Sequence, residues 1–285
     1  MPSPLISASE LANLLRERSN VRLLDVRWRL DVPEGRPAYL DGHLPGAVYV
    51  DLDNELARRD DPRRGRHPLP AREQLQDAAR RWGIDDGDTV VAYDDVQSVA
   101  AARAWWTLTR SGLTDVRVLD GGLRAWVAAQ LPLDTGDVLP PRGNVVLGDI
   151  DEDVTDIDEV EDWPWKGVLL DVRAPERYRG EVEPIDPVAG HIPGAVNLPT
   201  TAHVVAGKFR SPDEIRARFA AAGITDSSAV AAYCGSGVAA THTALAGAIA
   251  GIDVTVYPGS WSQWSHARGR LVAVGQTPAA EVSRL

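Results

Sequence analysis

The sequence predicts an α/β protein built from two similar domains, each with a mainly parallel sheet flanked by helices. The first observation is an internal repeat, in which four segments recur in the same order at a nearly constant offset. The second is the alternation of short apolar runs with helical stretches, which is typical of parallel sheets. The third is the length of 285 residues, which fits two domains of about 150 residues. The recurring segments are LLDVRWR and LLDVRAP, GHLPGAVYV and GHIPGAVNL, WGIDDGDTVVAYD and AGITDSSAVAAYC, and LDGGLRAW and YPGSWSQW.

The first half begins with a capping signal, Ser7-x-x-Glu10, that predicts an amphipathic helix. Apolar runs at 23–26, 90–93 and 116–119 predict strands, and a helix is expected at 99–110. In the second half, strands are expected at 168–171, 229–233 and 254–257, and a helix at 240–250. Another helix is expected after Ser211, with Pro212 at its first position.

These elements place one domain at 1–133, a linker at 134–150 containing Pro140-Pro141, and a second domain at 151–285. The acidic stretch 149–162 is interpreted as a solvated segment that leads into a surface helix. The arginine-rich run at 58–66 lacks interleaved aromatics and is interpreted as a solvated loop.

Composition excludes several classes of function. A net charge of −11 argues against non-specific nucleic-acid binding. The single Cys excludes an intrachain disulfide framework and a Cys-rich zinc site. No apolar run approaches the roughly 20 residues of a membrane span, and no signal peptide is visible. We therefore expect a cytoplasmic protein with no membrane partner.

The single cysteine, Cys234, stands where a predicted strand ends, and Gly235-Ser236-Gly237 leads from it into a helix. A loop of small residues lets backbone N–H groups converge on one point, and the helix N-terminus adds partial positive charge. Both features favour a thiolate and would stabilise a negative group attached to its sulfur. The alternative interpretation is a buried structural cysteine.

With these motifs, the chain resembles the tandem-domain rhodanese-type sulfurtransferases, and its loop is similar to that of the 3-mercaptopyruvate branch. The resemblance rests on DVR followed by GH-[LI]-PGA in both halves, and on CGSGV in the second half alone. It implies two rhodanese-like domains with the active site at their interface, of which only the second is catalytic. At the position of Cys234 the first half has Asp94, which cannot form a persulfide.

The resemblance also implies the reaction and its partners. A sulfane sulfur would pass from a small anionic donor, 3-mercaptopyruvate or thiosulfate, to cyanide, a thiol or a thioredoxin-like acceptor through a Cys234 persulfide. No metal and no cofactor are implied, and we expect a monomer.

The same resemblance implies a set of site residues. Cys234 is the nucleophile, Ser236 relays a proton, and His43 polarises Ser236. Arg177 binds the donor's carboxylate. The remaining binding residues are those of the loop, namely Gly235, Gly237, Val238 and Ala239.

Alternative interpretations stay open for three of these residues. The motif histidine recurs as His191, so His43 can equally hydrogen-bond the backbone in a structural role. Ser236 can simply cap its loop. Arg177 can form an ion pair with Glu181 or Glu183.

The donor is the least determined feature. The loop contains no charged residue, as in the 3-mercaptopyruvate type, but Ala239 stands where that type has Thr. The 3-mercaptopyruvate type also has a second carboxylate-binding Arg, and in that region this chain has Ile185 or Asp186 instead. A thiosulfate-preferring rhodanese and a non-catalytic sulfur-carrier or regulatory module therefore remain alternatives. A phosphatase is disfavoured because its loop ends in Arg, where this chain has Ala240 or Thr241.

Overall fold

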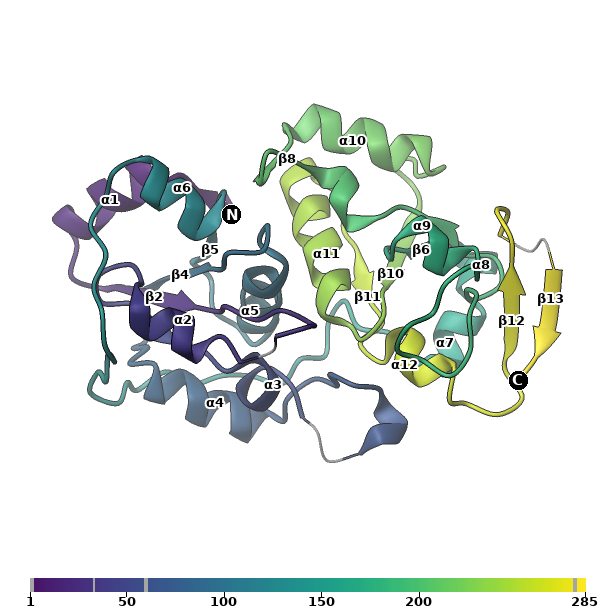
Figure 1. Ribbon diagram of the computed structural model, residues 1–285, viewed down its shortest axis with the longest axis horizontal. Helices are drawn as coiled ribbons and strands as arrows, with labels where there is room; N and C mark the ends of the chain where they lie inside the picture. Colours follow the sequence, from purple (N-terminus) through teal and green to yellow (C-terminus); the bar gives the residue numbers. More distant parts are fainter. Residues whose placement is uncertain (1–2, 33, 59–60, 279–280) are drawn as a thin grey trace. The chain divides into compact units, whose positions relative to one another are not determined.

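The computed structural model describes residues 3–32, 34–58, 61–278 and 281–285 (Figure 1). Its contacts divide the chain into two compact units. The described residues of Met1–Arg58, Leu69–Glu152 and Ala206–Phe209 form the first unit. Those of Arg59–Pro68, Asp153–Val205 and Arg210–Leu285 form the second. The short segment before Leu69 therefore belongs to the second unit although it lies within the first half of the sequence.

The first unit contains a five-stranded parallel sheet in the order β1-β5-β4-β2-β3. Its central strand β4 is buried along its whole length. Leu11 and Trp126 from two helices pack on the sheet in one apolar cluster with Leu23 and Val91. The elements of this unit are β1 (Leu5–Ile6), α1 (Ala8–Glu17), β2 (Val21–Asp25), α2 (Arg36–Asp41), β3 (Val48–Tyr49), α3 (Leu52–Glu55), α4 (Arg72–Arg81), β4 (Thr89–Tyr93), α5 (Val99–Arg110), β5 (Val116–Leu119) and α6 (Gly122–Ala128).

The second unit contains a four-stranded parallel sheet in the order β11-β10-β6-β7. The Ala-rich helix α11 lies against β10 and β11 and is buried on almost every side, which small side chains permit (Figure 1). The elements of the second half of the chain are α7 (Ile157–Glu161), α8 (Trp163–Lys166), β6 (Gly167–Asp171), α9 (Pro175–Tyr178), β7 (Val196–Asn197), η2 (Thr200–His203), β8 (Val204–Val205), β9 (Lys208–Phe209), α10 (Pro212–Ala221), β10 (Ala229–Tyr233), α11 (Val238–Ala250), β11 (Thr255–Val256), α12 (Ser260–Trp264), β12 (Leu271–Val274) and β13 (Glu281–Arg284). The 3-10 helix η1 (Pro62–Arg64) lies in the segment before Leu69.

The structure confirms the α/β class and most of the predicted elements. Both capping boxes form, at Ser7 and at Ser211. The segments 99–110, 116–119 and 229–233 have the predicted bounds, whereas α11 begins at Val238, two residues before the predicted start. The short strands β1, β3 and β7 escaped prediction because two residues carry no periodicity.

The segment 134–150, expected as a linker, contains no helix or strand but packs on the first unit. Val145 and Leu147 are buried, and the Gly143 amide donates to Arg80 O at 2.8 Å. The acidic stretch ends in the short helix α7, which Asp156 caps by accepting from the Asp158 and Glu159 amides.

One buried ion pair explains why two motifs recur together. In the first unit Arg27 pairs with Asp25 at 2.6 Å and also donates to Gly42 O at 2.7 Å. In the second unit Arg173 pairs with Asp171 at 2.5 Å and donates to Gly190 O at 2.6 Å. The arginine of DVR thus binds both the aspartate at the strand end and the glycine carbonyl of GH-[LI]-PG in each unit.

A second buried polar group makes stability depend on pH. His203 has no exposed surface, and neither ring nitrogen has a hydrogen-bond partner among the described residues. Its ring stacks on Phe219 with a centroid distance of 5.1 Å. Burial, with smaller contributions from His242 and Arg218, lowers the pKa of His203 from 6.5 to about 3.

We predict that this histidine destabilises the second unit in acid. Because the folded-state pKa lies below that of the unfolded chain, its contribution is complete above about pH 6.5 and is lost as the pH falls toward 3. Between pH 7.5 and 5 the loss is about 2 kcal/mol. Native-state hydrogen exchange of the β10 and α11 amides measures it, and His203→Leu should remove this part of the pH dependence. An equally steep dependence in the variant would contradict the assignment.

Candidate active site

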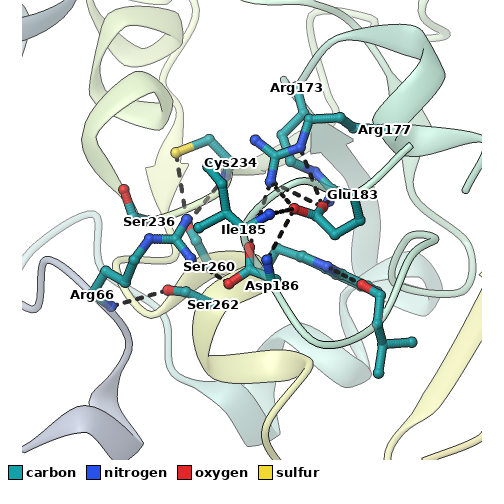
Figure 2. A network of polar contacts seen from close by, with 12 residues as sticks. Arg66, Arg173, Arg177, Glu183, Ile185, Asp186, Cys234, Ser236, Ser260 and Ser262 are labelled. Atoms are coloured by element: carbon teal, nitrogen blue, oxygen red, sulfur yellow. Dashed lines mark hydrogen bonds and ion pairs between the residues drawn. The ribbon is translucent and has the colours of Figure 1, made fainter. Parts of the chain in front are cut away.

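The cysteine directly follows β10, in a loop that points one backbone N–H at its sulfur (Figure 2). The Gly237 amide donates to Cys234 Sγ at 3.1 Å, and the Cys234 amide donates to Ser260 Oγ at 3.1 Å. The loop is also held by the Trp261 amide, which donates to Cys234 O at 3.0 Å. Cys234 itself is only 3% exposed. Its sulfur therefore faces a fixed N–H donor at the start of α11.

Glycine is required at position 237. Its φ is +85°, and a Cβ there would lie 2.3 Å from Pro258 O. Any side chain would push the loop away from Pro258 and remove the N–H from the sulfur. The other predicted loop residues follow this turn, with Val238 and Ala239 forming the first residues of α11.

A histidine that the sequence analysis did not single out contacts the loop serine. His67 Nδ1 lies 2.8 Å from Ser236 Oγ, and both residues are buried. His67 belongs to the segment before Leu69 that groups with the second unit. The signal for it was the turn sequence Gly65-Arg66-His67-Pro68 inside the arginine-rich run.

His43, predicted as the partner of Ser236, lies in the first unit. Its Nδ1 donates to Tyr39 O at 2.9 Å, and its ring stacks on Tyr39 at 4.2 Å. His191 makes the same two contacts with Tyr178, at 2.8 and 3.8 Å. The shared geometry favours the structural alternative for both histidines, and a catalytic role of His43 stays a prediction.

Arg177 forms the ion pair of the alternative interpretation, and its role in binding the donor stays a prediction. Its guanidinium pairs with Glu183, with Nη2 at 2.6 Å from Oε1, and both side chains are largely buried. The same guanidinium faces the loop, because a Cβ on Gly235 would lie 3.4 Å from Arg177 Nη1. Arg66 approaches the same glycine and forms an ion pair with Asp186 (Figure 2).

Interpreting the run 58–66 as a solvated loop is correct for Arg63, whose side chain is 90% exposed, and wrong for Arg66. Arg59 lies outside the described residues. Charge patterning did not identify Arg66 because its partner Asp186 is far away in the sequence.

The equivalent loop of the first unit shows what this backbone does with a negative charge. There the Asp94 carboxylate accepts from four backbone amides, with its Oδ1 bonded to Val96 and Ser98 at 2.9 Å each. Oδ2 accepts from Ala100 and Ala101 at 2.8 and 2.9 Å. The loop after the central strand is thus an anion cradle, which in the first unit is filled by the chain's own carboxylate.

Both halves of the chain are similar to proteins of one known family. Residues 7–129 and 156–267 each match the rhodanese-like domain family. A protein of Mycobacterium tuberculosis named putative thiosulfate sulfurtransferase SseB is 45% identical over 95% of this chain and 97% of its own length. A probable 3-mercaptopyruvate sulfurtransferase of Pseudomonas aeruginosa is 41% identical over 95% of this chain and 98% of its own.

Solved structures show the same similarity in their fold. SseA from Escherichia coli, described as a 3-mercaptopyruvate sulfotransferase with the rhodanese fold, superposes with a TM-score of 0.81 at 30% identity. The match covers 91% of this chain and 99% of that one. The chain therefore belongs to the tandem-domain rhodanese-type sulfurtransferase family.

Among the described residues, no three His, Cys, Asp or Glu side chains are grouped as metal ligands would be. None of the helices that the structure describes is both long and apolar enough to cross a bilayer.

We predict that the buried Asp94 carboxyl makes the first unit less stable as the pH rises, which is the opposite of the effect of His203 on the second unit. Burial raises the pKa of Asp94 from 3.8 to about 6 although four amides bind it. Its stabilising contribution is therefore complete below about pH 4 and is lost as the pH rises through 6.

The experiment compares the unfolding free energies of wild type and Asp94→Asn by denaturation in urea. The wild type should lose about 1 kcal/mol relative to the variant between pH 5 and 7.5. The variant should also be less stable at every pH, because its amide NH₂ faces backbone donors. A constant difference across this pH range would contradict the prediction.

Proposed function

We propose that this chain transfers a sulfane sulfur through a persulfide on Cys234. The observation that carries the proposal is the position of the chain's only cysteine. Cys234 directly follows β10, and the Gly237 N–H donates to its sulfur. The equivalent loop of the first unit binds the Asp94 carboxylate. A nucleophile in an anion cradle suits chemistry in which the enzyme-bound product is negatively charged.

The first half-reaction removes sulfur from the donor. The Cys234 thiolate attacks the donor's outer sulfur and forms the new S–S bond. With 3-mercaptopyruvate the C–S bond breaks, its electron pair leaves on pyruvate enolate, and a proton then converts the enolate into pyruvate. With thiosulfate the S–S bond breaks and sulfite leaves with the pair.

The second half-reaction passes the sulfur on. An acceptor nucleophile, such as cyanide, a thiol or a thioredoxin-like protein, attacks the outer sulfur, and Cys234 leaves as thiolate. Between the two steps the outer sulfur carries the negative charge. The four amides around Asp94 support the assignment of the corresponding N–H groups to the persulfide of the second unit.

The relatives' names support both donors, since SseB is named for thiosulfate and the Pseudomonas protein for 3-mercaptopyruvate. The uncharged loop of this chain and the two guanidinium groups beside Gly235, from Arg66 and Arg177, favour 3-mercaptopyruvate. We further propose a monomer acting in the cytoplasm, where reductants would keep the single thiol reduced.

Ser236 and His67 are proposed to handle the proton that the enolate needs. With Nδ1 protonated, the ring donates to Ser236 Oγ, so the hydroxyl proton can pass to the enolate carbon while the ring proton moves to the serine oxygen. The serine would touch the substrate and the histidine would position the serine. This assignment replaces His43 as the expected partner of Ser236.

Replacing Cys234 with Ser should abolish sulfur transfer to cyanide from either donor without unfolding the chain. After donor treatment, the wild-type peptide that contains Cys234 should gain the mass of one sulfur atom, and cyanide should remove it. Mass spectrometry and circular dichroism check both expectations. Activity in the variant, or an unmodified wild-type peptide, would favour the binding-module alternative.

Replacing His67 with Gln should lower kcat for 3-mercaptopyruvate by about 10²-fold, the size of a lost general acid. It should lower kcat for thiosulfate much less, because sulfite leaves without protonation. Steady-state kinetics over pH with both donors measures this difference.

His43→Gln is the matched control for the His67 variant. It should reduce stability through the contact with Tyr39 while leaving the donor ratio and the pH profile unchanged. The opposite result, a donor-selective loss in the His43 variant alone, would restore His43 as the partner of Ser236.

A further inference from the structure

Arg66 is held rigidly next to the nucleophile by its own segment. Its backbone amide donates to Ser262 Oγ at 3.1 Å. The preceding Gly65 has a φ of +96°, and a Cβ there would lie 2.6 Å from Gly259 O. The segment therefore lies directly on the residues around the start of α12, which also bind the Cys234 loop. This contact explains how a residue so distant in sequence reaches the site.

Two buried carboxylates orient Arg66 and Arg177. Asp186, whose side chain is 1% exposed, pairs with Nη1 of Arg66. Glu183, 3% exposed, accepts from Nε and Nη2 of Arg177 at 3.2 and 2.6 Å. The Ile185 and Asp186 amides each donate to Glu183 Oε1 at 3.1 Å and fix this carboxylate in turn (Figure 2). Each arginine is thus held along one side of its guanidinium.

The opposite side of each guanidinium faces the cysteine loop. A Cβ on Gly235 would lie 3.2 Å from Arg66 Nη2 and 3.4 Å from Arg177 Nη1. Neither of these two nitrogens has a hydrogen-bond partner among the described residues, and Arg66 Nε is buried without one. Two oriented donors from different segments therefore converge beside Gly235, the residue that follows the nucleophile, where the absence of a side chain lets both guanidinium groups approach.

The charges around these donors are balanced. Three arginines and three carboxylates form connected ion pairs, so the cluster has no excess positive charge. Its members are Arg66, Arg173, Arg177, Asp171, Glu183 and Asp186. A dianion such as thiosulfate would add two uncompensated negative charges to this neutral cluster, whereas a carboxylate adds one, which the two free N–H groups can bind.

We propose that Arg66 is a specificity-determining residue that, with Arg177, clamps the carboxylate of a monoanionic thiol donor of the 3-mercaptopyruvate class. The inference rests on the proposed function for the identity of the reaction. Asp186 and Glu183 act as positioning residues that turn the free N–H groups toward Gly235. An acid thus stands in the region where the resemblance implies a second arginine, and it holds an arginine supplied by another segment.

The single cysteine permits a test that does not require sulfur transfer. 3-Bromopyruvate has the carbon skeleton and carboxylate of 3-mercaptopyruvate, whereas bromoacetone lacks the carboxylate. Both alkylate the Cys234 thiolate with loss of bromide, and mass spectrometry reports the rates. In Arg66→Gln the ratio of the bromopyruvate rate to the bromoacetone rate should fall at least about 10-fold, as expected for a lost hydrogen bond to a charged group.

Arg179→Gln is the matched control, because the Arg179 side chain is equally exposed, at 28%, and also forms an ion pair, with Glu181. Its rate ratio should equal that of the wild type. In Arg66→Lys the ratio of the bromopyruvate rate to the bromoacetone rate should lie between those of the wild type and Arg66→Gln, because lysine keeps the charge but lacks the planar guanidinium.

Kinetics with the natural donors gives the second readout. Arg66→Gln should raise KM for 3-mercaptopyruvate at least about 10-fold and change kcat little. An unchanged alkylation ratio, or equal loss of both alkylation rates, would overturn the clamp and make Arg66 structural. A wild type that forms no persulfide would refute the proposed function while leaving the alkylation ratio as a measure of the anion site.

Discussion

The chemistry of this protein depends on the convergence of backbone N–H groups at the end of a central parallel strand. Strand and helix geometry point successive amides at one position, and only small residues or positive φ angles permit the turn. In the first unit that position holds the Asp94 carboxylate, bound by four amides. In the second it holds the Cys234 sulfur, which accepts from Gly237. The two loops therefore differ at one position, where a carboxylate fills the first loop and the thiol of the proposed nucleophile stands in the second.

Both units also contain the same buried ion pair. A buried Asp–Arg pair at the end of a neighbouring strand binds the carbonyl of a distant glycine, through Arg27 in one unit and Arg173 in the other. Because breaking a buried ion pair leaves an uncompensated charge, removing either partner would destabilise either unit. The persistence of DVR and GH-[LI]-PG in both halves thus follows from folding, and the motif histidines share this structural setting.

What distinguishes the second unit is a segment from the first half of the sequence. It brings His67 to Ser236 and Arg66 to Asp186. The balanced charges there also reconcile an acidic chain with an anionic substrate. In the proposed complex a few oriented N–H groups would hold the donor without a general positive field, so the net charge of −11 is no obstacle.

The sequence by itself determined the two-fold repeat, the α/β class and most strands and helices, and it indicated Cys234 as the candidate nucleophile. These features depend on local periodicity, capping and turn chemistry, which a single sequence displays. Only the tertiary structure decided which histidine contacts Ser236 and that Arg66 leaves the solvated run to pair with Asp186. Those contacts join segments far apart in the chain through buried charge and hydrogen bonding, for which no local pattern exists.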